Sequence, residues 1–252
     1  MSKRRLKILV LGHEGMLGNC LVKFLSRQRK NDEIITLDRC FRWPNQDFID
    51  ATRETHFDFV INCIGSIPQK KKDFSINLDL PVFLNESLPK GTFLINPGTD
   101  CEIDKDPYGI SKKAATDYLI SSREKIRILK TSIVGHELSG HVSLLDWFLK
   151  QNGDVKGYKN HFWNGITTLE WSKNCNNVID DFENYQKLTH LGTDCISKFD
   201  LLTYFKEVYN RSNFIEAVDH HEVKDKCLRI DIKTKPIKDQ LIDLRDFYER
   251  KH

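Results

Sequence analysis

Short apolar runs alternate with amphipathic stretches along the first half of the chain. The runs have the length and composition of buried strands, and they lie at 7–11, 33–37, 57–63, 92–96 and 126–131. Between them, apolar residues recur every three or four positions over 16–27, over 74–88 and after residue 107. Strands that alternate with helices in this way predict an α/β chain with a doubly wound parallel sheet.

The pattern changes after residue 135. Residues 136–175 are richer in His, Trp, Gly and Asn, which predicts loops with one or two helices outside the sheet. A return strand is expected at 188–191, followed by a helix that Ser197 caps. A very short strand is also expected near 47–49. The resulting domain assignment is a core at 1–135, with the return strand and helix at about 186–210, and a smaller C-terminal lobe at 136–185 and 211–252.

The first predicted strand runs directly into Gly12, Gly15 and Gly18. Glycines at this spacing let a backbone turn approach a pyrophosphate closely, and the helix that follows points its N-terminal amides at that group. Asp38 ends the second strand, twenty residues after Gly18, where a carboxylate binds the adenosine ribose in dinucleotide-binding folds. The pattern therefore predicts a Rossmann-type core that binds a nicotinamide dinucleotide.

Composition narrows the range of partners. The net charge of +3 over 252 residues is close to neutral, so neither a nucleic acid nor a membrane is indicated as a partner. The N-terminal apolar run is too short for a signal peptide and is interpreted as the first strand. The seven cysteines are scattered and include no Cys-x-x-Cys pair. We therefore expect neither a zinc site nor a disulfide framework, and a reducing, cytoplasmic location.

His220 and His221 are adjacent and could be taken for a pair of metal ligands. No third ligand lies at a suitable spacing from them in the sequence. A surface loop is therefore expected at this position, and no metal site.

Three side chains suit proton transfer to a carbonyl group. Tyr108 and Lys112 are four residues apart near the start of a predicted helix, so they project from one face. A nearby ammonium is expected to lower the pKa of the phenol and make Tyr108 a usable acid or base. Thr99 ends the preceding strand, and its hydroxyl is expected to reach the same carbonyl oxygen.

These motifs resemble the extended short-chain dehydrogenase/reductases. Gly12-x-x-Gly15-x-x-Gly18 resembles that family's glycine motif, and Tyr108-Gly109-Ile110-Ser111-Lys112 resembles its Tyr-x-x-x-Lys signature. Within the family, the chain is most similar to nucleotide-sugar 4-ketoreductases of the dTDP-4-dehydrorhamnose reductase type. The segments that resemble that group lie at 62–65, 75–78, 99–100, 131–137 and 163–169, and the resemblance covers residues 6 to 210.

The resemblance implies an NAD(P)-dependent oxidoreductase that reduces a 4-keto (deoxy) sugar linked to a nucleoside diphosphate, in the biosynthesis of a surface or secreted polysaccharide. It implies that Tyr108 is the acid, that Lys112 tunes Tyr108 and holds the nicotinamide ribose, and that Thr99 bonds the substrate oxygen. A homodimer is also compatible with it. The residues expected to bind the cofactor are Gly12, Gly15, Met16, Leu17, Gly18, Asp38, Arg39, Asp47, Cys63, Ile64, Gly65, Tyr108, Lys112 and Ile133.

The residues expected to bind the nucleotide sugar are Thr99, Asp100, His136, Asn160 and Trp163. Trp163 offers a ring for stacking on a base, and His136 and Asn160 offer hydrogen-bonding groups. A core tryptophan and ordinary polar loop residues explain the same pattern equally well.

The choice between NADH and NADPH depends on residues after the second strand. Asp38 would bond the ribose hydroxyls and repel a 2′-phosphate, which favours NADH. Arg39 and Arg42 follow immediately and could instead pair with that phosphate. We expect a preference for NADH with some use of NADPH.

The chain departs from the group in the segment before Tyr108. Only eight residues lie between Thr99 and Tyr108, where the group usually has a longer loop, and Gly98 replaces a serine that often precedes the threonine. A shorter loop is expected to leave the sugar pocket more open.

Two other functions fit the same scaffold. One is a nucleotide-sugar epimerase or dehydratase with tightly bound NAD; a dehydratase needs an extra acid/base pair, and Asp100 supplies one carboxylate but no Glu directly follows it. The other is a non-catalytic, dinucleotide-binding regulatory subunit. The presence of Thr99, Tyr108 and Lys112 together speaks against it, because a non-catalytic protein has no physical need for all three.

Overall fold

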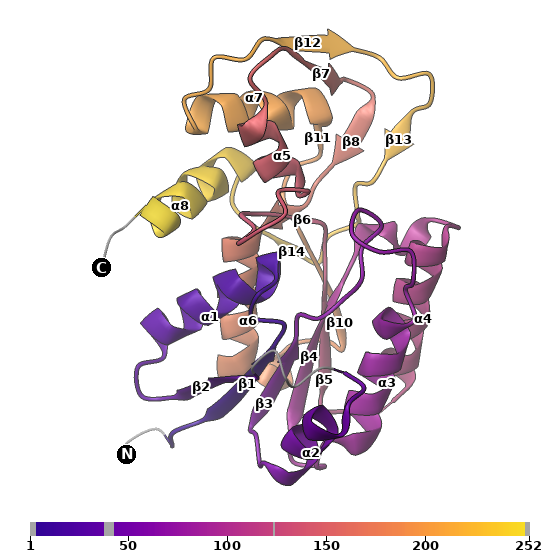
Figure 1. Cartoon of the computed structure of the whole chain (residues 1–252), viewed down its shortest axis with the longest axis vertical. Helices are drawn as coiled ribbons and strands as arrows, with labels where there is room; N and C mark the ends of the chain where they lie inside the picture. Colours follow the sequence, from indigo (N-terminus) through magenta and orange to yellow (C-terminus); the bar gives the residue numbers. More distant parts are fainter. Residues whose placement is uncertain (1–3, 38–42, 123, 250–252) are drawn as a thin grey trace. The chain divides into compact units, whose positions relative to one another are not determined.

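The computed structural model describes residues 4–37, 43–122 and 124–249 (Figure 1). The chain packs as two compact units. Unit 1 comprises the chain up to Lys130 together with Ser172–Thr189, and unit 2 comprises Thr131–Trp171 and the chain from His190 onwards.

A parallel sheet forms the centre of unit 1. Its strands are β1 (Lys7–Leu11), β2 (Glu33–Thr36), β3 (Phe59–Asn62), β4 (Phe93–Gly98) and β5 (Ile126–Lys130). The ladders between them are all parallel, in the order β5-β4-β3-β1-β2. Strand β10 (Leu188–Gly192) lies next to β5, and its last residues belong to unit 2, where they pair with β14 (Ile232–Lys233). The expected doubly wound, Rossmann-type α/β fold is confirmed.

Helices cover both faces of this sheet (Figure 1). They are α1 (Met16–Gln28), α2 (Gln46–Glu54), α3 (Ile76–Ser87), α4 (Pro107–Ser121) and the part of α6 (Thr168–Asp180) that belongs to unit 1, with 3₁₀ turns η1 (Asp100–Ile103) and η2 (Phe182–Asn184). On one face, Arg29 after α1 donates a 2.8 Å hydrogen bond to Asn176 of α6. On the other face, the aliphatic side chains of α3 and α4 pack on the strands.

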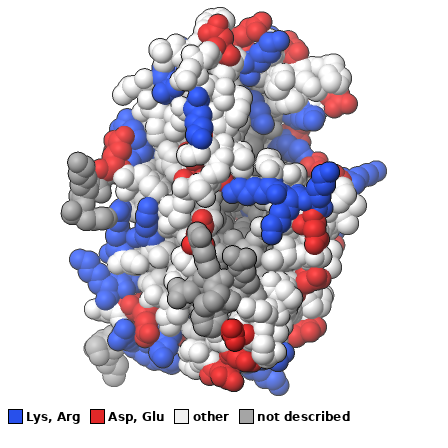
Figure 2. Space-filling view, viewed as in Figure 1, with Lys and Arg blue, Asp and Glu red and all other residues white. Residues whose placement is uncertain are grey.

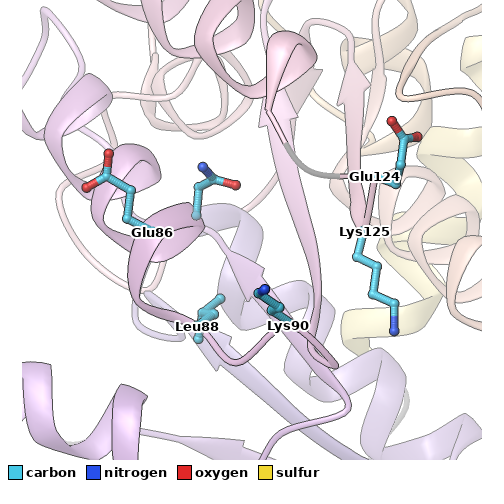
Figure 3. Close-up of a pocket in the computed structure, with 6 residues that line it drawn as sticks. Glu86, Leu88, Lys90, Glu124 and Lys125 are labelled. Atoms are coloured by element: carbon cyan, nitrogen blue, oxygen red, sulfur yellow. The ribbon is translucent and has the colours of Figure 1, made fainter.

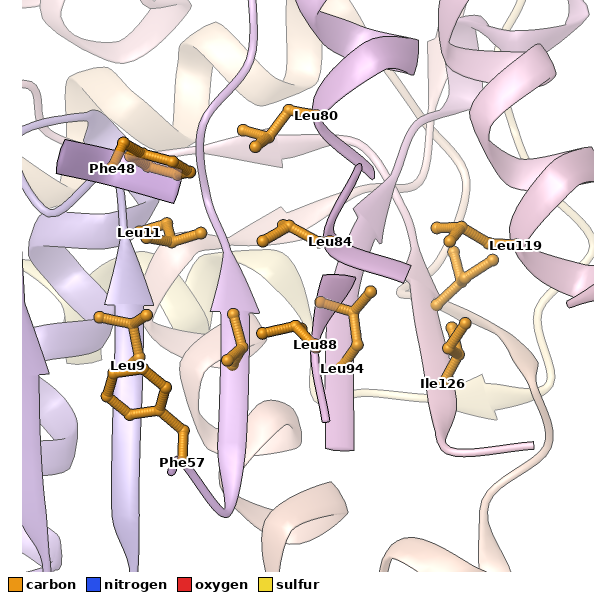
Figure 4. Packing of buried hydrophobic residues seen from close by; sticks show 12 residues of the cluster. Leu9, Leu11, Phe48, Phe57, Leu80, Leu84, Leu88, Leu94, Leu119 and Ile126 are labelled. Carbon is orange, nitrogen blue, oxygen red and sulfur yellow. The ribbon is translucent and has the colours of Figure 1, made fainter. Parts of the chain in front are cut away.

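The core on the face covered by α3 and α4 contains apolar side chains from the strands and from these two helices (Figure 4). Leu9, Leu84, Leu94 and Ile126 are fully buried in it. Their burial stabilises the strands whose carboxyl ends carry the candidate site, because removing apolar surface from water is the main favourable contribution to folding.

Unit 2 contains short ladders and three complete helices among its described residues. Its strands are β6 (Ile133–Val134), β7 (Val155–Tyr158), β8 (His161–Trp163), β9 (Ile166–Thr167), β11 (Ile196–Ser197), β12 (Ile215–Val218) and β13 (Lys224–Asp225), and its helices are α5 (Leu144–Lys150), α7 (Lys198–Val208) and α8 (Ile237–Glu249). Ser197 caps α7 by accepting a hydrogen bond from the backbone N–H of Asp200 at 3.0 Å, as expected from the sequence.

The short strand expected near 47–49 is a helix instead. Asn45 caps α2 by accepting a 3.0 Å hydrogen bond from the backbone N–H of Phe48. Phe48 and Thr52 lie four residues apart and are both buried, so the apolar spacing is helical. The expected strand is therefore wrong, because the Asn45 cap and the helical spacing of the buried residues favour a helix.

Cys195 and Cys227 form a disulfide, although no disulfide framework was expected from the sequence. Their Cα atoms are 5.9 Å apart, and 32 positions separate them in the sequence. Cys195 precedes β11 and Cys227 follows β13, and both strands pair with β8. The pairing brings together two cysteines that show no spacing motif. The expected reducing cytoplasm stays a prediction.

The two units differ in extent from the domains expected from the sequence. Helix α7 belongs to unit 2, whereas residues 172–180 of α6 belong to unit 1. None of the helices in the described ranges is both long and apolar enough to cross a membrane. Acidic and basic side chains are interspersed on the face shown in Figure 2.

Candidate active site

The glycine turn between β1 and α1 has the backbone that a close approach requires. Gly12 has a φ of +79°, and a Cβ there would lie 2.9 Å from the backbone of Cys63. A Cβ on Gly18 would overlap the carbonyl oxygen of Gly12. Gly15 is the N-cap of α1, and no acidic residue lies in the first turn of that helix. The turn therefore fits a pyrophosphate, with Met16 and Leu17 supplying the first helical amides.

The loop after β3 is held in place by two buried amides. Asn62 donates a hydrogen bond to the side chain of Asn96 at 2.9 Å and accepts one from the backbone N–H of Ile64 at 3.1 Å. Asn77 of α3 then accepts from the backbone N–H of Ser66 at 2.8 Å and donates to Ser111 of α4 at 3.1 Å. These bonds fix Cys63, Ile64 and Gly65 beside the glycine turn.

Thr99 follows β4 and caps the short 3₁₀ turn η1. Its hydroxyl accepts a hydrogen bond from the backbone N–H of Cys101 and donates one to Asp100 at 3.0 Å. Its backbone N–H donates to Glu102 at 3.0 Å, which completes a capping box. The segment between Thr99 and Tyr108 is therefore short and ordered.

The buried carboxylate of Glu102 has two further partners. It accepts a hydrogen bond from the Thr116 hydroxyl at 3.0 Å and pairs with Lys130 at 2.9 Å. Its side chain is only 2% exposed. Sequence reasoning missed this residue, although the Thr-x-x-Glu spacing of a capping box was available as a signal.

Tyr108 lies in the first turn of α4, as expected. The Asp106 side chain caps that helix by accepting a 2.7 Å hydrogen bond from the backbone N–H of Gly109. The Tyr108 phenol is hydrogen-bonded to the Thr99 side chain, and its ring makes an edge contact with Phe74 at 5.7 Å between centroids. The structure thus brings two of the three expected catalytic side chains together.

Lys112 lies one turn further along α4. Its Nζ donates a 3.1 Å hydrogen bond to the carbonyl oxygen of Pro97 in β4. Burial lowers the pKa of Lys112, while the charges of Glu102 and Cys63 raise it. Burial raises the pKa of the Cys63 thiol to about 12, against the opposing effect of Lys112. The ammonium is therefore close to the loop after β3.

Several groups around the Tyr108 phenol shift its pKa. Burial raises the pKa of Tyr108, and the charges of Cys101, Asp100 and Glu102 raise it further, whereas the hydrogen bond with Thr99 lowers it. Tyr108 is therefore a protonated phenol at neutral pH. The Nζ atom of Lys112 is directed at the carbonyl oxygen of Pro97. The expectation that Lys112 lowers the pKa of Tyr108 stays a prediction.

The residues of unit 2 that were expected to bind substrate make bonds within that unit. The two ring nitrogens of His136 lie 2.9 Å from Asp146 and 2.9 Å from the Tyr209 hydroxyl. The Asn160 side chain bonds the backbone of His220 at both its oxygen and its nitrogen. Trp163 is 6% exposed, so it presents little ring surface for stacking.

The remaining expected cofactor residues are spread over both units. Asp47 lies in the first turn of α2, and Ile133 begins β6 in unit 2. Asp38, Arg39 and Arg42 lie outside the described residues.

A surface pocket in unit 1 lies near the amino ends of β4 and β5, whereas the candidate site lies at the carboxyl end of β4 (Figure 3). Its lining includes Lys90, Glu124 and Lys125, which precede β4 and β5. Parallel strands carry their ligand-binding groups at the carboxyl ends, so this pocket is separate from the candidate site.

Comparison with known proteins shows that the chain has an α/β Rossmann-type fold, and the fold is all that it shows. No protein-family model matches the chain, and no curated protein sequence matches it. Among solved structures, dTDP-4-dehydrorhamnose reductase from Bacillus anthracis in complex with NADP has a TM-score of 0.82 at 14% identity, covering 96% of this chain and 99% of that chain.

Two further solved structures have the same fold and different reactions in their names. dTDP-glucose 4,6-dehydratase from Bacillus anthracis in complex with NAD has a TM-score of 0.74 at 14% identity, covering 97% of this chain and 96% of that chain. UDP-glucose 4-epimerase from Thermotoga maritima with UDP-glucose also has a TM-score of 0.74 at 14% identity, covering 96% of this chain and 98% of that chain. The reaction must therefore be argued from the site.

Proposed function

We propose that this chain is an NAD(P)H-dependent oxidoreductase that reduces a 4-keto (deoxy) sugar linked to a nucleoside diphosphate, in the biosynthesis of a surface or secreted polysaccharide. The observation that carries this proposal is the hydrogen-bonded pair of Thr99 and Tyr108 at the carboxyl end of β4, with Lys112 one helical turn away. The nucleotide sugars named for the solved structures with the same fold support the substrate class.

The glycine turn and the loop after β3 supply the cofactor half of the proposed site. Gly12, Gly15 and Gly18 would hold the pyrophosphate, and Lys112 would hold the nicotinamide ribose. A dinucleotide held there would supply the hydride for reduction of the substrate carbonyl carbon. Cys63, Ile64 and Gly65 would line the same cofactor, because hydrogen bonds through Asn62 and Asn77 fix their backbone.

The protein groups act on the oxygen of the substrate carbonyl. Tyr108 is protonated at neutral pH, as an ordinary tyrosine is, so it can donate its proton to that oxygen. The Thr99 hydroxyl, which donates its one proton to Asp100 in the structure, would turn that proton to the same oxygen when substrate is bound. The phenol therefore carries the proton that the substrate oxygen needs in the direction of reduction.

The environment of Glu102 disfavours the dehydratase alternative. A dehydratase needs a second acid/base pair beside the tyrosine, and Glu102 is the carboxylate nearest in sequence to Asp100. Its oxygens are already bound by Thr99, Thr116 and Lys130, so it is not available for proton transfer. Reduction therefore fits these side chains better than dehydration does.

The decisive experiment measures dinucleotide oxidation by the purified protein. We expect NADH or NADPH to be consumed when 4-keto-6-deoxy sugars linked to dTDP, GDP or UDP are supplied in turn. Tyr108→Phe should reduce kcat by about 10²- to 10⁴-fold, which is the usual contribution of a positioned acid, while leaving dinucleotide binding unchanged. Comparison of kcat/KM for the two dinucleotides tests the preference for NADH that Asp38 suggests.

The matched control is Tyr118→Phe on the same helix. The Tyr118 hydroxyl bonds Asn85 and Glu86 away from Thr99, so its loss should leave kcat within about twofold of wild type. Full activity of Tyr108→Phe would sink the catalytic assignment. Dinucleotide binding without turnover across the panel would favour the regulatory subunit, and NAD that co-purifies tightly would favour the epimerase or dehydratase.

A further inference from the structure

Three histidines and a glutamate gather within unit 2, where the sequence shows only an adjacent pair. Strand β12 pairs with β7 so that Val218 lies opposite Tyr158, and β13 pairs with β8 so that Lys224 lies opposite His161. The two parallel ladders bring the connection between β12 and β13 alongside the one between β7 and β8. His220, His221 and Glu222 lie on the former connection, and His161 begins β8.

The connection between β12 and β13 is fixed by Asn160. The Asn160 amide donates to the carbonyl oxygen of His220 at 2.7 Å and accepts from its backbone N–H at 2.9 Å. The backbone N–H of Lys224 donates to the carbonyl oxygen of Asn160 at 3.1 Å. These bonds hold the His220 ring 4.8 Å from the His161 ring, between centroids.

The ligand atoms on this connection converge. His220, His221 and Glu222 each offer one ligand atom, and these atoms all lie within 4.8 Å of one another. The backbone N–H of Glu222 donates to Nδ1 of His220 at 3.2 Å, and the Glu222 carbonyl oxygen lies 3.3 Å from the same nitrogen. Metal binding at Nε2 of His220 requires the tautomer with its proton on Nδ1, which exchanges the bond from the Glu222 N–H for a bond to the Glu222 carbonyl oxygen.

His161 supplies an independent indication of a ligand. Its side chain belongs to a residue that is only 8% exposed, and its buried Nε2 has no hydrogen-bond partner among the described residues. A buried polar atom without a partner costs free energy that a bound ligand would recover.

We propose that His220, His221 and Glu222, with His161 beside His220, bind one Zn²⁺ ion. Imidazole and carboxylate ligands suit Zn²⁺ and leave little affinity for Mg²⁺, which prefers oxygen ligands and retains its water. The ion would link β8 to the connection between β12 and β13. His221 and Glu222 are exposed, at 78% and 63% of their side chains, so the ion can enter from solvent.

The test uses the full chain after treatment with a chelator, with the disulfide intact. Titration calorimetry with Zn²⁺ should give one site per chain, and the metal should raise the Tm because it binds the folded state. His221→Gln and the double variant His220→Gln/His221→Gln should each weaken Zn²⁺ binding by about tenfold or more. His161→Gln should do the same. Mg²⁺ at millimolar concentration should leave the Tm unchanged.

The control variant is His56→Gln, because His56 is an exposed histidine of unit 1. It should bind Zn²⁺ as wild type does. Absence of a Tm shift and of binding in the wild-type chain would overturn the proposal, as would undiminished affinity in the double variant. The proposal would equally fail if binding required reduction of the disulfide. In that case the ion would lie on Cys195, Asp225 and Cys227, whose ligand atoms also lie within 4.8 Å of one another.

Discussion

Gly109 follows Tyr108 in the first turn of α4, where the 3₁₀ turn η1 packs against the helix. A Cβ at this position would overlap the carbonyl oxygen of Cys101 and lie 2.8 Å from that of Asp104. Alanine ordinarily favours a helix over glycine by about 1 kcal/mol, but here it must displace backbone. We expect Gly109→Ala to lower the free energy of unfolding by about 1–3 kcal/mol in urea denaturation.

Gly153→Ala is the control for this substitution, because a Cβ at Gly153 meets no atom within 4 Å. It should change the free energy of unfolding by less than about 0.5 kcal/mol. Equal stability of the two variants would contradict the close packing of η1 on α4. Because η1 also carries Thr99 at its start, Gly109→Ala should reduce turnover as well.

At the residue scale, the sequence predicted the positions of the site better than its electrostatics. The four-residue spacing of Tyr108 and Lys112 and the strand end at Thr99 are local features, and the structure places all three in unit 1 as expected. The phenol pKa depends on burial and on which way Lys112 points, and neither can be derived from spacing. Glu102 affects both pKa values, yet only its capping-box spacing was visible in the sequence.

At the scale of elements, β8 lies between two short strands that the disulfide joins. Strand β11 pairs with it on one side and β13 on the other, and Cys195 and Cys227 adjoin these outer strands. The crosslink closes a loop of 32 positions, for which the chain-entropy model gives a stabilisation of about 3–4 kcal/mol. We expect a reductant to lower the urea midpoint of the wild-type chain by a corresponding amount.

The double variant Cys195→Ser/Cys227→Ser should have the midpoint of the reduced wild type and should not respond to reductant. Thiol titration in denaturant should find two more thiols after reduction than before it. Identical urea transitions of the wild type with and without reductant would show that the bond does not stabilise the fold.

Helix α2 and the short strands of unit 2 were predicted poorly, because each depends on contacts with residues outside the element itself. The segment at 47–49 is helical because Asn45 caps α2, a side-chain bond that apolar alternation does not reveal. The ladders of unit 2 are two to four residues long, so hydrophobic periodicity carries little signal in them. The same ladders bring His161 beside His220, which is why the histidine cluster was not visible in the sequence.

At the scale of the whole molecule, the alternation of strands and helices was sufficient to predict the doubly wound sheet. The limits of the two units were not predictable, because a unit is defined by packing between distant segments and α6 contributes to both. The expected homodimer stays a prediction, as does the polysaccharide whose synthesis the proposed reaction would serve.

The response of the molecule to acid follows from carboxylates that are hydrogen-bonded in the folded state. Burial would raise the pKa of Asp146, but hydrogen bonds from His136 and from the backbone N–H of Glu137 outweigh it, so the pKa is lowered. A carboxylate with a lowered pKa contributes stability above its unfolded pKa of about 3.9, and that stability is lost as the pH falls through the folded value. Asp231, bonded by His190, has a lowered pKa for the same reason.

We therefore expect the free energy of unfolding to fall steeply as the pH drops below about 4. Asp146→Asn should cost about 1–3 kcal/mol at pH 7, because it weakens hydrogen bonds to a charged group, and its stability should fall less steeply in acid. Urea denaturation at a series of pH values measures both effects, with the exposed Asp154→Asn as control. Parallel pH profiles for Asp146→Asn and wild type would show that Asp146 does not contribute to acid sensitivity, and that the bonds to His136 and Glu137 do not lower its pKa in solution.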